Sequence, residues 1–206
     1  MVGGFVIHVP YRSHRPSLES SFGPSSRAVN LGTTSIFDLE LADNELEWFF
    51  WKGLGQLSTM TRPDENSAWS APRDLGIDGF SPSLSADGLT LYFITLEGAL
   101  NASCRKAINT PWQPPVSIGI AAAFRIASID ISVDGLSLVI TGDTESLSAG
   151  VYLSNRTNLS SPFAEPIAIE SLRGGYQNAR FSSNDREIVV SAEYGGNHEL
   201  FITERH

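Results

Sequence analysis

Apolar and polar residues alternate along several short stretches of this chain, which is the period of a β-strand with one buried face. The clearest stretch is Leu89–Phe93, in which every second residue is leucine or phenylalanine. Directly before it stands Asp87-Gly88, a pair that tolerates the positive φ angles of a tight hairpin turn. No stretch combines a sustained 3.6-residue apolar period with helix caps. The pattern therefore predicts an all-β chain with very little helix.

This hairpin pattern is repeated. Residues 83–93 recur clearly as 130–140, more weakly as 180–190 and most weakly as 40–50. A second block, Trp-x-x-Pro-like, covers 69–76, 112–119 and 163–169, with a frayed copy at 22–32. A third block is a short strand ending in arginine, at 57–62, 100–105, 151–156 and 200–205. The four turn residues on which the copies align are Asn44, Asp87, Asp134 and Asn184.

Each repeat is predicted to be a four-stranded antiparallel meander. Its proline-bearing strand is expected to be outermost, because proline offers no N–H to a second neighbour. A lone sheet cannot cover both of its faces, whereas copies stacked around an axis can, and a period of about 40–50 residues is typical of a β-propeller. The rival immunoglobulin-like sandwich imposes no repeat of this length. We expect one propeller domain over residues 1–206, with repeats at about 35–76, 80–119, 127–169 and 177–206.

Two segments carry a family resemblance: Ser81–Phe93 and Trp112–Gly119. They resemble the WD-repeat-like propeller units of TolB-type proteins, and the resemblance extends over most of residues 22–205. It implies a ring of six or seven blades in full-length relatives, which are often exported and fused to other domains. This sequence has four recognisable units, which is the smallest number of blades usual for a β-propeller. The fold prediction is thus an all-β propeller of four recognisable four-stranded blades, partial or with a fifth incomplete blade.

The closure of the ring has three possible forms. Residues 1–32 are expected to supply strands of a closing or incomplete blade, since Phe5–Arg12 and Val29–Gly32 resemble third and fourth strands of a repeat. A strand near Val29 completes the last blade in a four-bladed ring, and residues 5–31 form a separate incomplete blade in a five-bladed one. We favour a third form, a piece of a larger or permuted ring, because Phe5–Val9 otherwise lacks a partner.

Composition narrows the class of protein. Hydrophobic residues make up 41% and charged residues 18%, as in a globular domain, and no apolar run reaches the length of a membrane span. The net charge of −9 argues against a nucleic-acid partner. Cys104 is the only cysteine, and His8, His14, His198 and His206 have no metal-ligand spacing, so neither a cofactor nor a metal is expected. No signal peptide is visible, and the compartment stays open.

Polar residues recur four and six positions before each turn residue, on the predicted innermost strand. Unlike the turn residues, they differ between repeats, with three acids and one arginine, as an asymmetric binding site requires. The alternative is a water-filled channel lined by solvated groups. The candidate binding residues at the channel mouth are Asp38, Glu40, Ser81, Ser83, Ser128, Asp130, Asn178 and Arg180.

Other candidate chemistry has a structural explanation. The turn residues recur at the same place in every repeat, which indicates turn formation, and the acids near Gly135 lack the spacing of a calcium loop. Ser103 and Lys106 match a Ser-x-x-Lys pair, but they fall where a strand is expected rather than a helix. The aromatic run Trp48–Trp51 is expected in the core, or on a docking surface if the first blade is an exposed end.

Two functions remain. We expect a non-enzymatic recognition module that binds a protein or small ligand at the channel mouth, with no catalytic residue. The alternative is a glycan-active or other hydrolytic propeller, in which Asp38, Glu40 and Asp130 act as acid and base. Such chemistry needs two carboxyl groups about 5–5.5 Å or about 6.5–9.5 Å apart in an open pocket.

Overall fold

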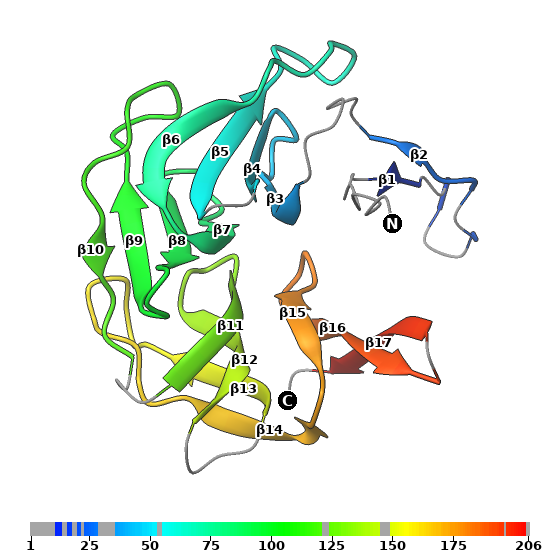
Figure 1. Cartoon of the computed structure of the whole chain (residues 1–206), viewed down its shortest axis with the longest axis vertical. Coiled ribbons are helices and arrows are strands. Elements are labelled where there is room, and N and C mark those ends of the chain that lie inside the picture. Colours follow the sequence, from blue (N-terminus) through cyan, green and yellow to red (C-terminus); the bar gives the residue numbers. More distant parts are fainter. Residues whose placement is uncertain are drawn as a thin grey trace, which may run out of the picture.

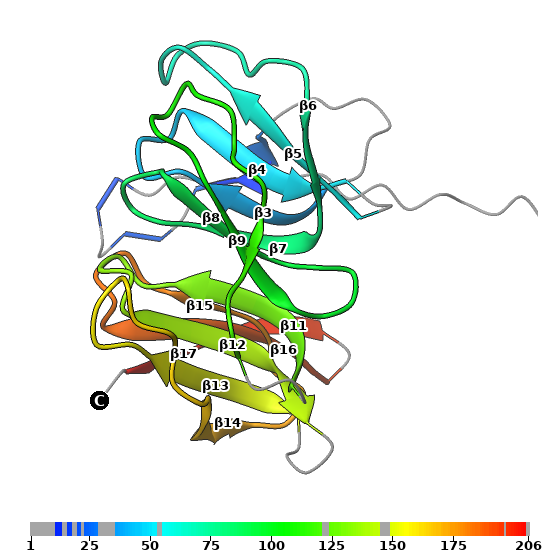
Figure 2. The same ribbon diagram turned by 90° about the vertical axis from the view of Figure 1, so that its left-hand side faces the viewer.

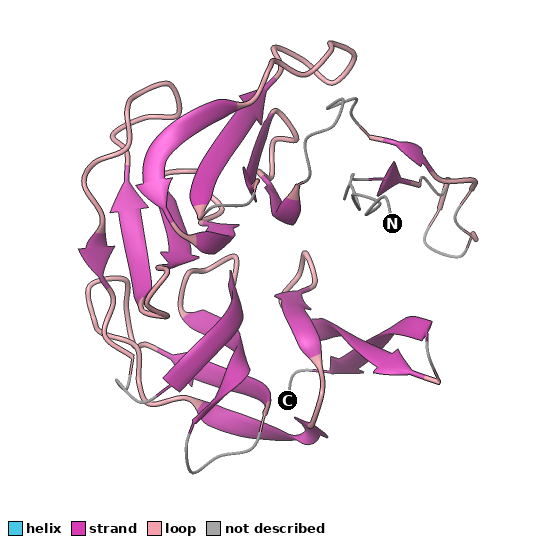
Figure 3. Cartoon of the chain, viewed as in Figure 1, coloured by secondary structure: helices cyan, strands magenta, loops and turns pink. Residues whose placement is uncertain are grey.

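In the computed structural model, four antiparallel sheets stand around a central axis as the blades of a β-propeller (Figure 1). This confirms the predicted all-β propeller fold and excludes a two-layer sandwich. The structure describes residues 11–13, 16–17, 20–21, 23–28, 36–52, 55–120, 124–144, 149–195 and 197–204. Within these ranges it contains strands, turns and loops but no helix (Figure 3).

Every blade is a meander whose first strand is nearest the axis. Figure 2 shows the sheets from the side, with neighbouring strands of a blade running next to one another. Blade 1 consists of β3 (Phe37–Leu41), β4 (Glu47–Trp51), β5 (Gln56–Thr61) and β6 (Arg73–Asp78). Blade 2 consists of β7 (Phe80–Leu84), β8 (Thr90–Ile94), β9 (Leu100–Cys104) and β10 (Val116–Ser117). Blade 3 consists of β11 (Phe124–Ile131), β12 (Ser137–Thr144), β13 (Gly150–Asn155) and β14 (Ile167–Arg173), and blade 4 of β15 (Gln177–Phe181), β16 (Glu187–Tyr194) and β17 (Asn197–Glu204).

The N-terminal region contributes a separate two-stranded sheet. Strand β1 (Tyr11–Arg12) pairs with β2 (Ser26–Arg27), on the side of the ring where blades 1 and 4 are not neighbours (Figure 1). The rest of the expected N-terminal strands, residues 5–10 and 29–32, lies outside the described residues. The role of residues 1–32 as a closing or incomplete blade therefore stays a prediction.

The core lies between the blades, where apolar faces of successive sheets meet. Phe49 packs between blades 1 and 2 with Leu91 and Phe93, while Trp48 and Phe50 pack on the other face of blade 1. Both phenylalanines are fully buried and Trp48 is 6% exposed. Most of the aromatic run 48–51 is thus core, as expected, and not a docking surface.

The repeated acidic and amide residues form the turns between the first two strands of each blade. In every blade the Oδ1 atom of this residue accepts a hydrogen bond from the main-chain N–H two positions on, at 2.8–3.1 Å. The next residue has a positive φ, which glycine adopts without strain. That residue is Gly88 or Gly135 in blades 2 and 3, and Glu45 or Asp185 in blades 1 and 4. These side chains therefore have a structural role.

An arginine directly after the third strand ties this turn to the rest of its blade. The Nε atoms of Arg62, Arg105 and Arg156 donate to turn carbonyls at 2.8, 2.7 and 2.8 Å. Each guanidinium also lies over an aromatic ring seven residues further along, 4.5–4.6 Å from its centroid. The rings belong to Trp69, Trp112 and Phe163.

This stacking corrects one prediction. The Trp-x-x-Pro block was expected to form the outermost strand, but its aromatic residue and its prolines precede that strand. Strands β6, β10 and β14 begin at Arg73, Val116 and Ile167, directly after Pro72, Pro115 and Pro166. The aromatic side chain has to leave the sheet to cover the arginine, and proline ends the loop where no N–H donor is needed.

Candidate binding site at the propeller axis

A β-bulge interrupts each of the four inner strands. In every blade the inner strand has one extra residue relative to the second strand, and the shifts lie between Phe37 and Glu40, Phe80 and Ser83, Ile126 and Ser128, and Gln177 and Arg180. Asp38, Ser81 and Asn178 stand at the bulge with φ of 46°, 49° and 50°. A bulge bends a strand and redirects its side chains. The candidate residues thus lie at this bend or directly after it.

Three of these side chains connect their blade to the next one. Glu40 Oε1 accepts the N–H of Leu84 at 3.0 Å, which joins blade 1 to blade 2. At the same repeat position, Ser83 Oγ accepts the N–H of Ile131 at 3.0 Å. Asp130 Oδ2 accepts the N–H of Phe181 at 2.7 Å. We call these three hydrogen bonds the axial links.

Further hydrogen bonds support the axial links. Ser83 Oγ donates to Asp130 Oδ1 at 2.9 Å, so both carboxylate oxygens of Asp130 are engaged. At the bulge, Ser81 Oγ accepts the N–H of Ile129 at 3.1 Å, and the carboxylate of Asp38 accepts a main-chain hydrogen bond from Ser81. Ser128 is different, because its hydroxyl bonds to that of Thr141 within its own blade.

Arg180 reverses the direction of these contacts. It occupies the position of Glu40, Ser83 and Asp130 in blade 4, but a guanidinium has only donors. It donates to the carbonyl of Ile129 in the preceding blade and lies 3.9 Å from Asp130 Oδ1. Burial raises the pKa values of Asp38 and Glu40 across the axis, and the charge of Arg180 opposes that rise. Blades 4 and 1, which are not neighbours, therefore interact through charge and share no axial link.

Burial dominates the electrostatics of the axial acids. It raises the pKa of Glu40 to about 8; the nearby Asp130 acts in the same direction, and Arg180 opposes it. Burial also raises the pKa values of Asp130 and Asp38, although Arg180 and the hydrogen bonds to each carboxylate oppose the change. Glu40 consequently carries a proton at neutral pH.

A small hollow of about 180 Å³ opens at the mouth of the axis. Three of the eight candidate residues line it, and the other five do not. Its wall also contains two acids that the sequence analysis missed, although they flank the turn residues of the first and last repeats. The candidates that line the hollow are Glu40, Asp130 and Arg180, and the added acids are Asp43 and Asp185.

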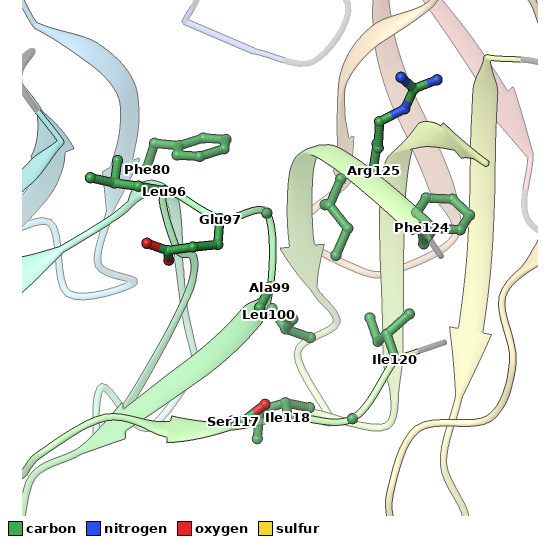
Figure 4. A pocket seen from close by; sticks show the side chains of 13 residues that line it. Phe80, Leu96, Glu97, Ala99, Leu100, Ser117, Ile118, Ile120, Phe124 and Arg125 are labelled. Carbon is green, nitrogen blue, oxygen red and sulfur yellow. The ribbon is translucent and has the colours of Figure 1, made fainter. Parts of the chain in front are cut away.

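Two larger cavities lie away from the axis. One, of about 750 Å³, lies between blades 2 and 3, where β10 ends after two residues and leaves Leu100, Ile118 and Phe124 beside a groove (Figure 4). Another, of about 760 Å³, lies between blades 1 and 2 and contains Arg73 and Arg105. Neither includes a candidate axial residue.

No group of three histidine, cysteine or acidic side chains able to hold a metal ion occurs among the residues described here. His8, His14 and His206 lie outside them. Ser103 lies on β9 and donates to the carbonyl of Gln113, so the Ser-x-x-Lys match is not at a helix start. The described ranges also contain no helix long and apolar enough to cross a membrane.

Comparison with known proteins supports the fold. No model of a known protein family matches this sequence, and no curated protein matches it either. Solved structures do match. TolB from Acinetobacter baumannii is 14% identical with a TM-score of 0.53, and the alignment covers 84% of this chain and 41% of TolB.

Two other solved structures are similar to the chain. The Cps50 (Swd1) β-propeller domain of Myceliophteria thermophila is 9% identical, with a TM-score of 0.51 and coverage of 81% of this chain and 50% of that domain. The catalytic domain of the Coprinopsis cinerea GH62 α-L-arabinofuranosidase is 15% identical, with a TM-score of 0.59 and coverage of 86% and 76%. This chain thus spans half or less of TolB and Cps50. At such identities the likeness shows the β-propeller fold alone, since propellers host both binding proteins and enzymes.

Proposed function

We propose that this chain is a TolB-type, WD-repeat-like recognition module without enzymatic activity, and that it binds its partner at the mouth of the axis. The main support is the use of the axial acids. Glu40 and Asp130 accept main-chain hydrogen bonds from the next blade, and each oxygen of Asp130 already accepts a hydrogen bond within the chain. A general acid or base has to reach the reacting group directly.

The size and charge of the hollow indicate which chemical group it can bind. At about 180 Å³ it is smaller than the roughly 300–1,000 Å³ of typical small-molecule sites. Four acids line it against one arginine, so negative charge remains in excess even with Glu40 protonated. A lysine or arginine side chain of a protein partner has suitable size and charge. The exposed Asp43 is available to meet it at the rim.

Blocked single amino acids test this proposal. In a titration followed by amide NMR, N-acetyl-arginine and N-acetyl-lysine methylamides should shift the resonances of Val133, Ser183 and Asp185, which line the hollow. The corresponding glutamate compound should not. Asp43→Asn should weaken binding, whereas Asp78→Asn, on the exposed edge of β6, should not. Equal shifts with the glutamate compound would overturn the proposal.

The hydrolytic alternative has one observation in its favour. A carboxyl group with a pKa near 8, such as that of Glu40, holds a proton at neutral pH and so has the protonation state of a general acid. Aryl glycosides and lactones serve as test substrates. Turnover that disappears in a folded Glu40→Gln variant would establish the enzyme and refute the recognition module.

A further inference from the structure

The sheet of blade 4 has one covered and one open face. Ile188 and Val190 of β16 are each 1% exposed and pack towards blade 3. Because side chains alternate along a strand, Val189 faces the opposite way. It lies across from Ile202 of β17, and Leu200 projects from the same face. Ile202 and Leu200 are 65% and 74% exposed, so the open face has an uncovered apolar centre.

Acidic residues surround this apolar centre. Glu187 and Glu204 lie directly opposite each other in the β16–β17 register, and both are exposed. Like charges in this arrangement repel unless a cation lies between them. Together with Asn184 and Arg186 they line a hollow of about 590 Å³. Glu193, at the far end of β16, projects from the same face, so acids outnumber the single arginine.

At the axis, blade 4 differs from blades 1–3 in the side chain that faces a following repeat. A repeat packed like blades 2, 3 and 4 presents an inner-strand N–H to an acceptor of the preceding blade, as Leu84 does to Glu40. Blade 4 has Arg180 at this position, which lacks an acceptor and already donates to Ile129. A second copy of the chain that placed its own Glu187 and Glu204 against the same acids would bring like charges together.

We propose that the open face of β16 and β17 is a docking surface for an extended, basic segment of a partner protein. Alternate apolar side chains of the segment cover Val189, Leu200 and Ile202. A lysine or arginine enters the hollow between Glu187 and Glu204 and removes their repulsion. This surface is separate from the axial mouth.

Two synthetic peptides test the docking surface. One has about the length of β17, which is 8 residues, with alternating valine and threonine and a lysine at each end. The other has glutamate in place of the lysines. In fluorescence anisotropy with the full chain, we expect the lysine peptide to bind at least about ten-fold more tightly, because the charges across the interface are complementary. Higher ionic strength should weaken that binding.

Variants locate the binding. The double change Glu187→Gln and Glu204→Gln should remove most of the preference for lysine, and Leu200→Ser with Ile202→Ser should abolish binding. Leu159→Ser with Ile167→Ser is the matched control, because these residues of blade 3 are similarly exposed at 66% and 72%. Thermal melts show whether each variant is folded.

Four results would each overturn the docking proposal. These are equal binding of the two peptides, binding retained by the Leu200→Ser and Ile202→Ser variant, a dimer of the chain that this variant abolishes, and binding seen only after removal of residues 1–10. The last two identify a second copy or the N-terminal segment as the occupant. None of them depends on the axial mouth, which Asp43→Asn tests separately.

Discussion

Arg105 Nη2 lies 2.7 Å from Glu47 Oε2, and this ion pair joins blade 2 to blade 1 with both side chains less than a tenth exposed. The same guanidinium also donates to the carbonyls of Gly88 and Ile108 and stacks on Trp112. Removing one partner of a buried pair leaves the other charge uncompensated, which typically costs about 3–5 kcal/mol. We expect Glu47→Gln to reduce the free energy of unfolding by this order, as measured by urea denaturation. The matched control is Glu170→Gln, in the exposed pair with Arg173, which should have almost no effect on stability.

The axial links should contribute measurably to stability. Ser83→Ala removes the acceptor of the Ile131 N–H and a donor to Asp130, both in buried surroundings. An unsatisfied buried polar group costs about 1–3 kcal/mol, so a loss in this range is expected in chemical denaturation. Ser117→Ala changes an exposed serine of β10 and should have almost no effect. Equal stability of the two variants would contradict the structural role of the links.

Glu40 predicts an unusual dependence of stability on pH. Its pKa is about 8 in the folded chain against 4.5 without the fold, so the folded chain binds the proton more tightly. The stabilisation is complete below pH 4.5 and is lost as the pH rises through about 8. Every tenfold gain in proton affinity on folding corresponds to about 1.4 kcal/mol of stability. The raised pKa of Asp130 acts in the same direction.

Thermal melts between about pH 5 and pH 8 test this prediction, since the melting temperature of the chain should fall across this range. The fall should be smaller in Glu40→Gln, whose side chain does not titrate. Asp64→Asn is the control, because hydrogen bonds from Ser67 and Asn66 lower the pKa of Asp64 and keep its titration below this range. A melting temperature that rises with pH would refute the assignment.

The backbone conformation of Glu45 predicts that a substitution at this position stabilises the chain. It has a φ of 55° in the turn position that glycine occupies in blades 2 and 3, and its carboxylate is only a distant partner of Arg62 at 3.7 Å. A left-handed conformation costs a residue with a side chain about 1–2 kcal/mol relative to glycine. Replacing Glu45 by glycine removes this cost, but part of the gain in stability is lost because glycine also makes the unfolded chain more flexible. We therefore expect Glu45→Gly to raise stability by about 0.5–1 kcal/mol, as measured by the denaturation midpoint.

The fold could be predicted because its signals are local and repeated. The turn at Asp87-Gly88 and the alternation after it need only neighbouring residues, and the repeats placed the inner strand correctly in sequence. The position of Trp69 could not be found in this way, because it depends on stacking against Arg62. The spacing of seven residues between these two was visible in three repeats, but spacing alone does not show that a ring leaves its strand.

Three residues of the axial hollow could be predicted from the sequence, but their contacts could not. Counting back from the turns selected Glu40, Asp130 and Arg180, which do line one hollow. The same count also selected Ser81 and Ser83, whose hydroxyls accept main-chain hydrogen bonds from the next blade. Whether a polar group faces a ligand or the next sheet depends on the packing of segments more than 40 residues apart. The sequence did not identify Glu47 as a member of an ion pair, since its partner Arg105 is 58 residues away.

The axial links run in one direction, and this limits how such a chain can lengthen during evolution. The inner strands of blades 2 and 3 each hold an acceptor side chain for the next blade and the amide that the previous blade needs. A duplicated copy of blade 2 inserted before blade 3 would find compatible neighbours on both sides without any new contact. A copy added after blade 4 would meet the guanidinium of Arg180 and require a compensating substitution there. Growth by duplication is therefore easier between blades 2 and 3 than directly after blade 4.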